Sequence, residues 1–188
     1  RIGRLWFQWR SFSPVPLFIL LVALPAEFQP GFSGYLLALM GALVGEAIRI
    51  WGVGFAGSAT RTRGDRIPEL VTAGPYCYVR NPLYVGNLLL YTSCAVAFGS
   101  VTLAFIIFGY SLVQYSLIIR YEESMLRHSF GEPYDTYQAA VPRWIPRFTP
   151  GVPASSHAFD LTRALRSERS TFYCMFAMLT LLILKQNI

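Results

Sequence analysis

Apolar residues gather in five runs that are separated by short polar, proline-rich or glycine-rich connections. The runs cover residues 14–27, 31–55, 82–99, 101–119 and 171–184, and a helix needs about 20 mostly apolar residues to cross a membrane. The first run is short and carries Pro16 and Pro25, which also fits a re-entrant or signal-like segment. No small-residue cleavage site follows it, so we expect it to be retained. The pattern predicts an all-α, multi-span integral membrane helix bundle of about five transmembrane helices.

The composition agrees with a membrane environment. Hydrophobic residues make up 54% of the 188 residues, charged residues only 14%, and the mean hydropathy is +0.42. Soluble domains carry about 25% charged residues, so we expect the bilayer to supply much of the solvent.

The basic residues lie on one side of the predicted spans. They occur before the first run and between the second and third, and again between the fourth and fifth, whereas residues 28–30 and 99–100 carry none. Because Arg and Lys accumulate on the cytoplasmic side, we expect a multi-pass protein of a prokaryotic inner membrane, with the amino terminus cytoplasmic and the carboxyl terminus outside. The arginines concerned are Arg1, Arg4, Arg10, Arg61, Arg63, Arg66 and Arg80, followed by those from Arg120 to Arg169.

The net charge of +6 on that side favours membrane lipids with anionic headgroups as partners. Nucleic acid is not an expected partner, because the arginines are scattered through membrane-proximal loops and do not form a soluble basic module. Cys77, Cys94 and Cys174 lack a C-x-x-C spacing, and His128 and His157 are few and far apart. We therefore expect neither a disulfide framework nor a metal site.

The chain divides into three predicted parts. Residues 1–55 form N-terminal membrane helices, residues 56–148 form a core of loop, two spans and a covering segment, and residues 149–188 hold a linker, an amphipathic helix at 160–169 and a C-terminal span. Within the core, Asn81 is expected to cap the helix that starts at Pro82, since Asn is a favoured N-cap and Pro fits the first turn.

Charged residues stand at the ends of two predicted spans. Glu46 and Arg49 are three residues apart on one helical face and can neutralise each other; the alternatives are an interfacial ion pair or a cavity lining. Glu122 and Glu123 follow the fourth span on a helix that Gly131 should end, and they point about 100° apart, so they can serve different partners. We expect Arg80 and Arg120 as ionic neighbours of one carboxylate and a ligand at the other.

Five segments resemble one family in order and spacing: residues 70–76, 79–86, 122–123, 130–137 and 141–143. The family is that of the membrane-embedded methyltransferases, which includes isoprenylcysteine carboxyl methyltransferase and the phospholipid N-methyltransferases. The resemblance covers about residues 69–148. It implies methyl transfer from the cofactor S-adenosylmethionine to a lipid-like or small apolar acceptor at the cytoplasmic membrane face.

The resemblance also implies roles for particular residues. The cofactor would be held between the third and fourth spans and covered by the segment after Gly131. Its expected contacts are Glu69, Leu70, Val71, Tyr76, Asn81, Pro82, Leu83, Tyr84, Glu122 and Glu123. A carboxylate can accept strong hydrogen bonds from ribose hydroxyls or an ammonium group, and tyrosine rings can face adenine or a sulfonium.

Asn81 and Arg120 are the catalytic candidates. The family's usual Arg-His-Pro is here Arg80-Asn81-Pro82, and an amide can hydrogen-bond but cannot act as a general base near neutral pH. Arg120 would orient an anionic acceptor or pair with Glu122. The residues do not name the acceptor or the attacked atom (O, N or S).

Two other functions remain open at this point. One is an NADPH-dependent membrane reductase, because the sterol reductases have a related C-terminal architecture. The other is a non-catalytic lipid-binding or cofactor-binding membrane protein, in which Asn81 marks lost chemistry.

Overall fold

The computed structural model describes residues 2–9, 14–57 and 69–186, and in this part of the chain all regular structure is helical. The predicted all-α class is confirmed. The helices are α1 (Ile2–Trp9), α2 (Val15–Ala23), α3 (Phe32–Ala56), α4 (Pro82–Ala97), α5 (Val101–Phe130), α6 (Glu132–Ala140) and α7 (Leu161–Gln186), with a 3₁₀ turn, η2 (Gly74–Cys77), before α4. Arg1, Arg10, Arg61, Arg63 and Arg66, on which part of the topology prediction rests, lie outside the described residues.

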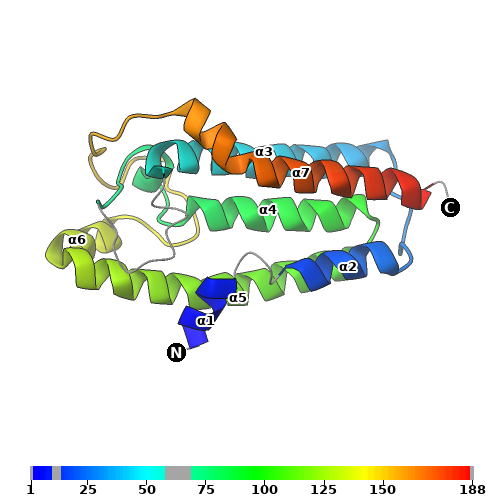
Figure 1. Cartoon of the computed structure of the whole chain (residues 1–188), viewed down its shortest axis with the longest axis horizontal. Coiled ribbons are helices and arrows are strands. Elements are labelled where there is room, and N and C mark those ends of the chain that lie inside the picture. Colours follow the sequence, from blue (N-terminus) through cyan, green and yellow to red (C-terminus); the bar gives the residue numbers. More distant parts are fainter. Residues whose placement is uncertain (1, 10–13, 58–68, 187–188) are drawn as a thin grey trace.

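Four long helices run side by side along the molecule in the order α7, α3, α4, α5 (Figure 1). α1 packs on α5, and α2 touches α7 near the end of the molecule where α7 finishes. α6, η2 and the segment between α6 and α7 gather at the opposite end (Figure 1).

The structure does not confirm the prediction of about five transmembrane helices. Within the described residues, two helices are long and apolar enough to cross a membrane, α3 with 25 residues and α5 with 30. α4 is apolar but has 16 residues, and α2 has nine, which at 1.5 Å per residue is about half a bilayer core. The predicted amphipathic helix at 160–169 and span at 171–184 are one continuous helix, α7.

Capping explains where α5 begins and ends. The Ser100 hydroxyl accepts a hydrogen bond from the Leu103 N–H at 3.2 Å and donates to the Glu27 carboxylate at 2.6 Å. The other Glu27 oxygen accepts from the N–H groups of Val101 and Thr102, both at 3.1 Å. This satisfies N–H groups that a helix start leaves without intrahelical partners. The helix ends at Gly131, as predicted, where φ is +60°.

Two glycines allow α3 and α4 to pack closely. A Cβ placed on Gly45 would lie 2.7 Å from the Gly86 carbonyl oxygen, and one on Gly86 would lie 2.6 Å from the Gly45 carbonyl oxygen. A Cβ on Gly86 would also meet the Arg49 side chain at 2.6 Å. No side chain fits at this crossing, so the pair of glycines fixes how near the two backbones come.

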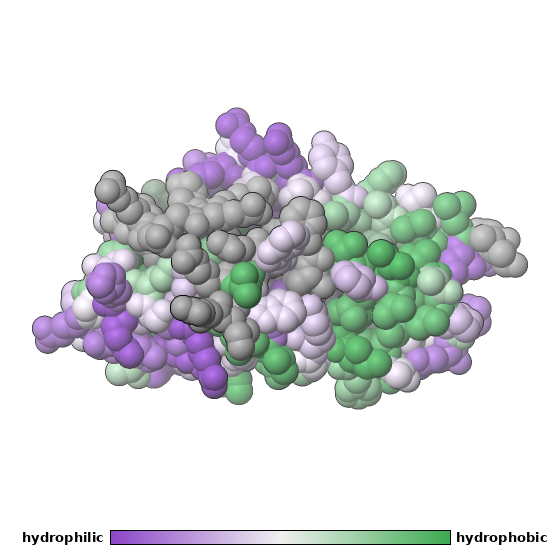
Figure 2. All heavy atoms as spheres, turned by 60° about the horizontal axis from the view of Figure 1, so that its bottom comes forward, coloured by the Kyte–Doolittle hydropathy of each residue, from purple (hydrophilic) through white to green (hydrophobic). Residues whose placement is uncertain are grey.

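The outer surface is strongly apolar over the helical bundle. Large exposed hydrophobic side chains occur on α2, α3, α5 and α7, for example Phe32, Leu37, Phe105 and Phe176. Figure 2 shows this hydrophobic surface on one part of the molecule and hydrophilic side chains toward the end where α6 lies. A soluble protein rarely exposes so much contiguous apolar surface, and the distribution fits membrane association.

Protonation of Glu27 should weaken the start of α5. The pKa of Glu27 is lowered, first because its carboxylate accepts the Ser100 hydrogen bond and then through the bond from Thr102. A lowered folded-state pKa gives stability that is complete above glutamate's ordinary pKa and is lost as pH falls through the folded value. We expect the melting temperature in detergent to fall over that acidic range, and to fall less in Glu27→Gln. Identical pH profiles for the two proteins would contradict this role.

Candidate functional site

One large cavity, of about 1820 Å³, runs between the helices and reaches the end of the bundle where α6 lies. Its lining at that end includes all the residues that the sequence predicted to hold a cofactor, namely Glu69, Leu70, Val71, Tyr76, Asn81, Pro82, Leu83, Tyr84, Glu122 and Glu123. They come from the segment before η2, from η2 itself, from the start of α4 and from the second half of α5. Arg120 is exposed on α5 and does not line the cavity.

Backbone hydrogen bonds hold the segment after α6 against residues 77–80. The N–H of Arg80 donates to the Pro142 carbonyl at 2.9 Å, the N–H of Arg147 to Tyr78 at 3.0 Å, and the N–H of Gly151 to Cys77 at 2.8 Å. Residues 141–151, which we call the covering segment after their expected role, therefore lie alongside residues 77–80. Of the residues after Gly131, Tyr134 and Tyr137 of α6 line the cavity.

Tyrosines form the wall between this segment and the cavity. The Tyr137 hydroxyl donates to the Tyr76 carbonyl at 2.9 Å, and Tyr134 is almost fully buried beside it. Burial raises the pKa of Tyr76 and Tyr137 above the ordinary tyrosine value and that of Tyr134 to about 12. All three hydroxyls therefore stay protonated at neutral pH and can act as hydrogen-bond donors.

Glu122 faces the cavity beside a pair of stacked rings. Its Oε1 accepts a hydrogen bond from the Tyr84 hydroxyl at 2.9 Å. The Tyr84 ring stacks on the Tyr115 ring, with centroids 4.6 Å apart. A carboxylate and two aromatic faces thus lie together where α4 and α5 meet.

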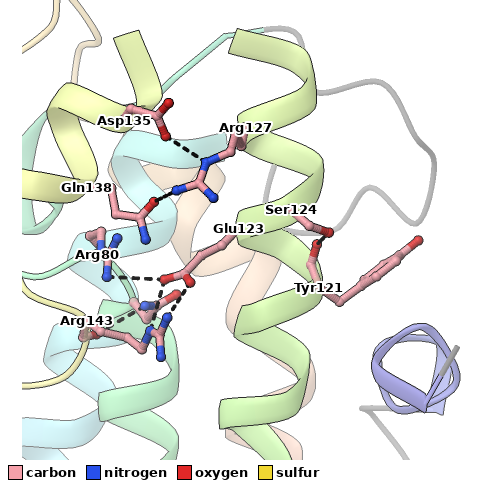
Figure 3. Close-up of polar contacts among 9 residues, drawn as sticks. Arg80, Tyr121, Glu123, Ser124, Arg127, Asp135, Gln138 and Arg143 are labelled. Atoms are coloured by element: carbon pink, nitrogen blue, oxygen red, sulfur yellow. Dashed lines mark hydrogen bonds and ion pairs between the residues drawn. The ribbon is translucent and has the colours of Figure 1, made fainter. Parts of the chain in front are cut away.

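Glu123 points to two arginines, Arg80 and Arg143, as Figure 3 shows. Arg80 Nη2 lies 3.3 Å from Glu123 Oε1, and Arg143 donates from Nε at 3.0 Å and from Nη2 at 2.5 Å. The prediction that the two carboxylates serve different partners is confirmed, and Arg80 is one ionic neighbour. Arg120 was wrongly named as the other, because Arg143, on the covering segment, takes that place.

Asn81 stands at the N-cap position of α4, but its side chain caps nothing. Its amide Nδ2 instead donates to the Arg143 carbonyl at 3.1 Å. The predicted side-chain cap is therefore wrong, and the amide joins the start of α4 to the covering segment. Pro82 occupies the first turn as predicted.

A second polar cluster lies farther along the helices, and sequence reasoning found only part of it. Its Arg49, Asn87 and Glu168 line the cavity. The predicted pair of Glu46 and Arg49 is present, with 3.4 Å between Oε2 and Nε. The Arg49 guanidinium also donates to the side-chain Oδ1 of Asn87 and to Glu168 Oε2. Glu168 lies on α7, 119 residues from Arg49 in the chain. A local sequence pattern cannot predict such a pairing.

A histidine lies near the mouth of the cavity. His157 Nε2 is 2.9 Å from Glu69 Oε2, and His157 Nδ1 is 2.8 Å from the Ser155 hydroxyl. Within the described residues, no three His, Cys, Asp or Glu side chains are placed to hold a metal ion.

Comparison with known proteins identifies a family and two relatives. The sequence model of the phospholipid methyltransferase family matches residues 32–133, which is more than half of the chain. The nickel-cobalt-cadmium resistance protein NccN of Alcaligenes xylosoxydans xylosoxydans is 30% identical over 75% of this chain and 64% of its own length. The cobalt-zinc-cadmium resistance protein CzcN of Cupriavidus metallidurans is 28% identical over 60% of this chain and 49% of its own. The matches thus span less than two thirds of either relative. No solved structure matches.

The ion pairs of Figure 3 give a matched test of burial. Glu123 is 11% exposed and shared by two arginines, whereas Asp135 is 52% exposed and paired with Arg127 at 2.7 Å. Removing one member of a buried pair costs about 3 kcal/mol, and an exposed pair contributes at most about 1 kcal/mol. We expect Glu123→Ala to lower the unfolding free energy in detergent much more than Asp135→Ala. Equal losses would show that the covering segment does not depend on Glu123.

Proposed function

Since this chain belongs to the phospholipid methyltransferase family, we propose that it transfers a methyl group from S-adenosylmethionine to a lipid-like or otherwise membrane-soluble acceptor. The observation that supports this most is the cavity itself. Its end near α6 carries carboxylates, tyrosines and an arginine, and the rest of its lining is largely apolar. A polar cofactor and an apolar acceptor would thus each find matching surface in one continuous space.

The residues at the polar end fit the chemistry of the cofactor. Arg80 lines the cavity, and its Nε and Nη1 are buried without a hydrogen-bond partner among the described residues. Buried donors without partners are costly, and a carboxylate such as that of the methionine part would satisfy them. Glu122 could accept from ribose hydroxyls or the ammonium group, and the ring of Tyr84 offers a face to adenine or the sulfonium.

When bound, the cofactor would supply an activated methyl group on sulfur. The chain's own contribution would be positioning and exclusion of water. The covering segment, held by Arg143 and the backbone bonds to residues 77–80, would keep water from this end of the cavity. Asn81 would hold that segment in place through its bond to the Arg143 carbonyl. Arg120 lies outside the cavity, so we do not assign it a contact with the acceptor.

The acceptor would reach the cavity from the membrane. Much of the lining comes from apolar residues of α2, α3, α4 and α7, including Phe18, Leu39, Leu90 and Leu182. We retain the multi-pass arrangement with the polar end in the cytoplasm as part of the proposal, because Arg80, Arg127, Arg143 and Arg147 lie at that end. The names of the relatives place those proteins in metal resistance, and for this chain we propose only the methyl transfer.

Glu122→Gln tests the site directly. Replacing the carboxylate by an amide removes the charge that would accept the cofactor's donors, so we expect the affinity for S-adenosylmethionine to fall at least about tenfold. Isothermal titration of the detergent-solubilised protein measures this. Glu132→Gln, an exposed change on α6, is the matched control and should bind as the parent does. Unchanged affinity in Glu122→Gln, or binding of NADPH in place of S-adenosylmethionine by the parent, would overturn the proposal.

Arg80→Lys tests which part of the cofactor meets the arginine. Lysine keeps the charge near Glu123 but loses the unpaired Nε and Nη1 donors. We expect Arg80→Lys to weaken the binding of S-adenosylmethionine. The same change should leave the affinity for decarboxylated S-adenosylmethionine unaltered, because that compound has no carboxylate for Arg80 to bind. A loss of equal size for both compounds would show that Arg80 acts elsewhere.

A further inference from the structure

The second polar cluster lies beside the proposed cofactor end and is connected to it by contacts. Tyr84 bonds Glu122 and stacks on Tyr115, and the Tyr115 hydroxyl accepts a hydrogen bond from Asn87 Nδ2 at 3.1 Å. The side-chain Oδ1 of Asn87 in turn accepts a hydrogen bond from the Arg49 guanidinium. Asn87, Arg49 and Tyr115 all line the cavity. A group bound at the cluster would thus lie in the same cavity as the proposed cofactor site, one aromatic pair away.

The cluster also depends on α7, which lies outside the region that the family model matches. Glu168 is 2% exposed and bonds Arg49, while the Thr171 hydroxyl donates to Glu168 Oε2 at 2.7 Å. Glu168, Thr171 and Cys174, one turn farther on, line the cavity. Ionisable groups among apolar helices are costly and usually face a partner or a cavity, and this cluster does both.

The cluster leaves buried acceptor atoms, and one buried donor, without hydrogen-bond partners among the described residues. Two carboxylates, those of Glu46 and Glu168, share the single guanidinium of Arg49. Both Glu46 oxygens are buried without a hydrogen-bond partner among the described residues, and both hydrogen bonds to Glu168 go to Oε2. Arg49 Nε is likewise buried without a hydrogen-bond partner among the described residues. A ligand that can both donate and accept a hydrogen bond, as a hydroxyl does, therefore fits this place, whereas a carboxylate can only accept.

We propose that the cluster of Glu46, Arg49, Asn87, Glu168 and Thr171 binds the hydroxyl group of an apolar alcohol or phenol inside the cavity. A hydroxyl can donate a hydrogen bond to the carboxylate oxygens that have no partner in the cluster. It carries no charge, and it therefore fits a wall on which the charges of Arg49 and Glu168 already neutralise each other. An ammonium group would also donate, but its transfer into an apolar cavity costs far more, and it would lie against the guanidinium. The identification of this ligand as the methyl acceptor rests on the proposed function, whereas the binding itself does not.

Cys174 gives a readout of occupancy that is independent of activity. It is exposed and lines the cavity, so a ligand at the cluster should slow its reaction with a maleimide. The probes are dodecanol, dodecylamine and dodecanoic acid, which share one chain and differ in the polar group. The protein is placed in lipid nanodiscs, and modification of Cys174 is followed by peptide mass spectrometry.

We expect dodecanol to protect Cys174 at a concentration about tenfold lower than either charged probe, because a site that is built to hydrogen-bond one group rejects its analogues strongly. Glu168→Gln and Glu46→Gln should each raise that concentration severalfold, and the exposed Glu132→Gln should not. Glu46→Gln keeps the test valid if Glu168→Gln fails to fold, since Glu46 does not hold α7. Equal protection by dodecylamine or dodecanoic acid, or unchanged protection in Glu46→Gln, would overturn the inference.

Titration with S-adenosylmethionine on the same samples separates this inference from the proposed function. Protection by dodecanol together with no binding of S-adenosylmethionine would leave the hydroxyl site standing and remove the methyltransferase. Binding of S-adenosylmethionine without protection by dodecanol would do the reverse.

Discussion

The close crossing of α3 and α4 at Gly45 and Gly86 is the constraint on which the rest of the structure depends. Because neither position has room for a Cβ, the two backbones come near enough for the Arg49 stem to pass Gly86 and reach the side-chain Oδ1 of Asn87, the next residue of α4. The same contact fixes where α4 begins, since Pro82 lies one turn before Gly86. The start of α4 then sets the positions of Asn81 and Tyr84 at the cavity. Two glycines that do not themselves line the cavity thus influence the geometry of the polar end.

A second constraint follows from the apolar surroundings. Polar groups among membrane helices find partners inside the protein or face a cavity, and both polar clusters obey this. At the end near α6, Arg80 and Arg143 share Glu123 and hold the covering segment in place. Farther along, Arg49 joins α3, α4 and α7 through Asn87 and Glu168. The clusters therefore tie together helices that the apolar contacts alone would leave free to slide, and each leaves polar groups facing the space between them.

The sequence predicted the helical class and much of the polar end, because those signals are local. Apolar runs located α3, α4 and α5, Gly131 ended α5, and the ten residues expected at a cofactor all line one cavity. What failed depended on distant contacts or on length. The sequence predicted α2 as part of a longer apolar run. Hydropathy alone does not indicate that the helix ends at Ala23, before Leu24 and Pro25. Arg120 precedes Glu123 closely in the chain, whereas Arg143 lies 20 residues away, and only packing of the covering segment brings Arg143 to Glu123. The role of Glu168 could not be predicted for the same reason, because its partner Arg49 lies on another helix, 119 residues away in the chain.

The place of Asn81 bears on the chemistry that the site can perform. Its amide is engaged with the Arg143 carbonyl, while the neighbouring Arg80 N–H bonds Pro142, so residues 80 and 81 both hold the covering segment. An amide cannot take a proton at neutral pH, and burial keeps the hydroxyls of Tyr76 and Tyr137 protonated. Among the side chains that line this end of the cavity, those that can accept a proton are the carboxylates. Glu123 is paired with two arginines, and Glu69 lies 2.9 Å from His157 Nε2. An acceptor that must lose a proton on methylation would therefore depend on Glu122 or on the carboxylates beside Arg49. The distribution of carboxylates along the cavity, and not Asn81, would then select the acceptor.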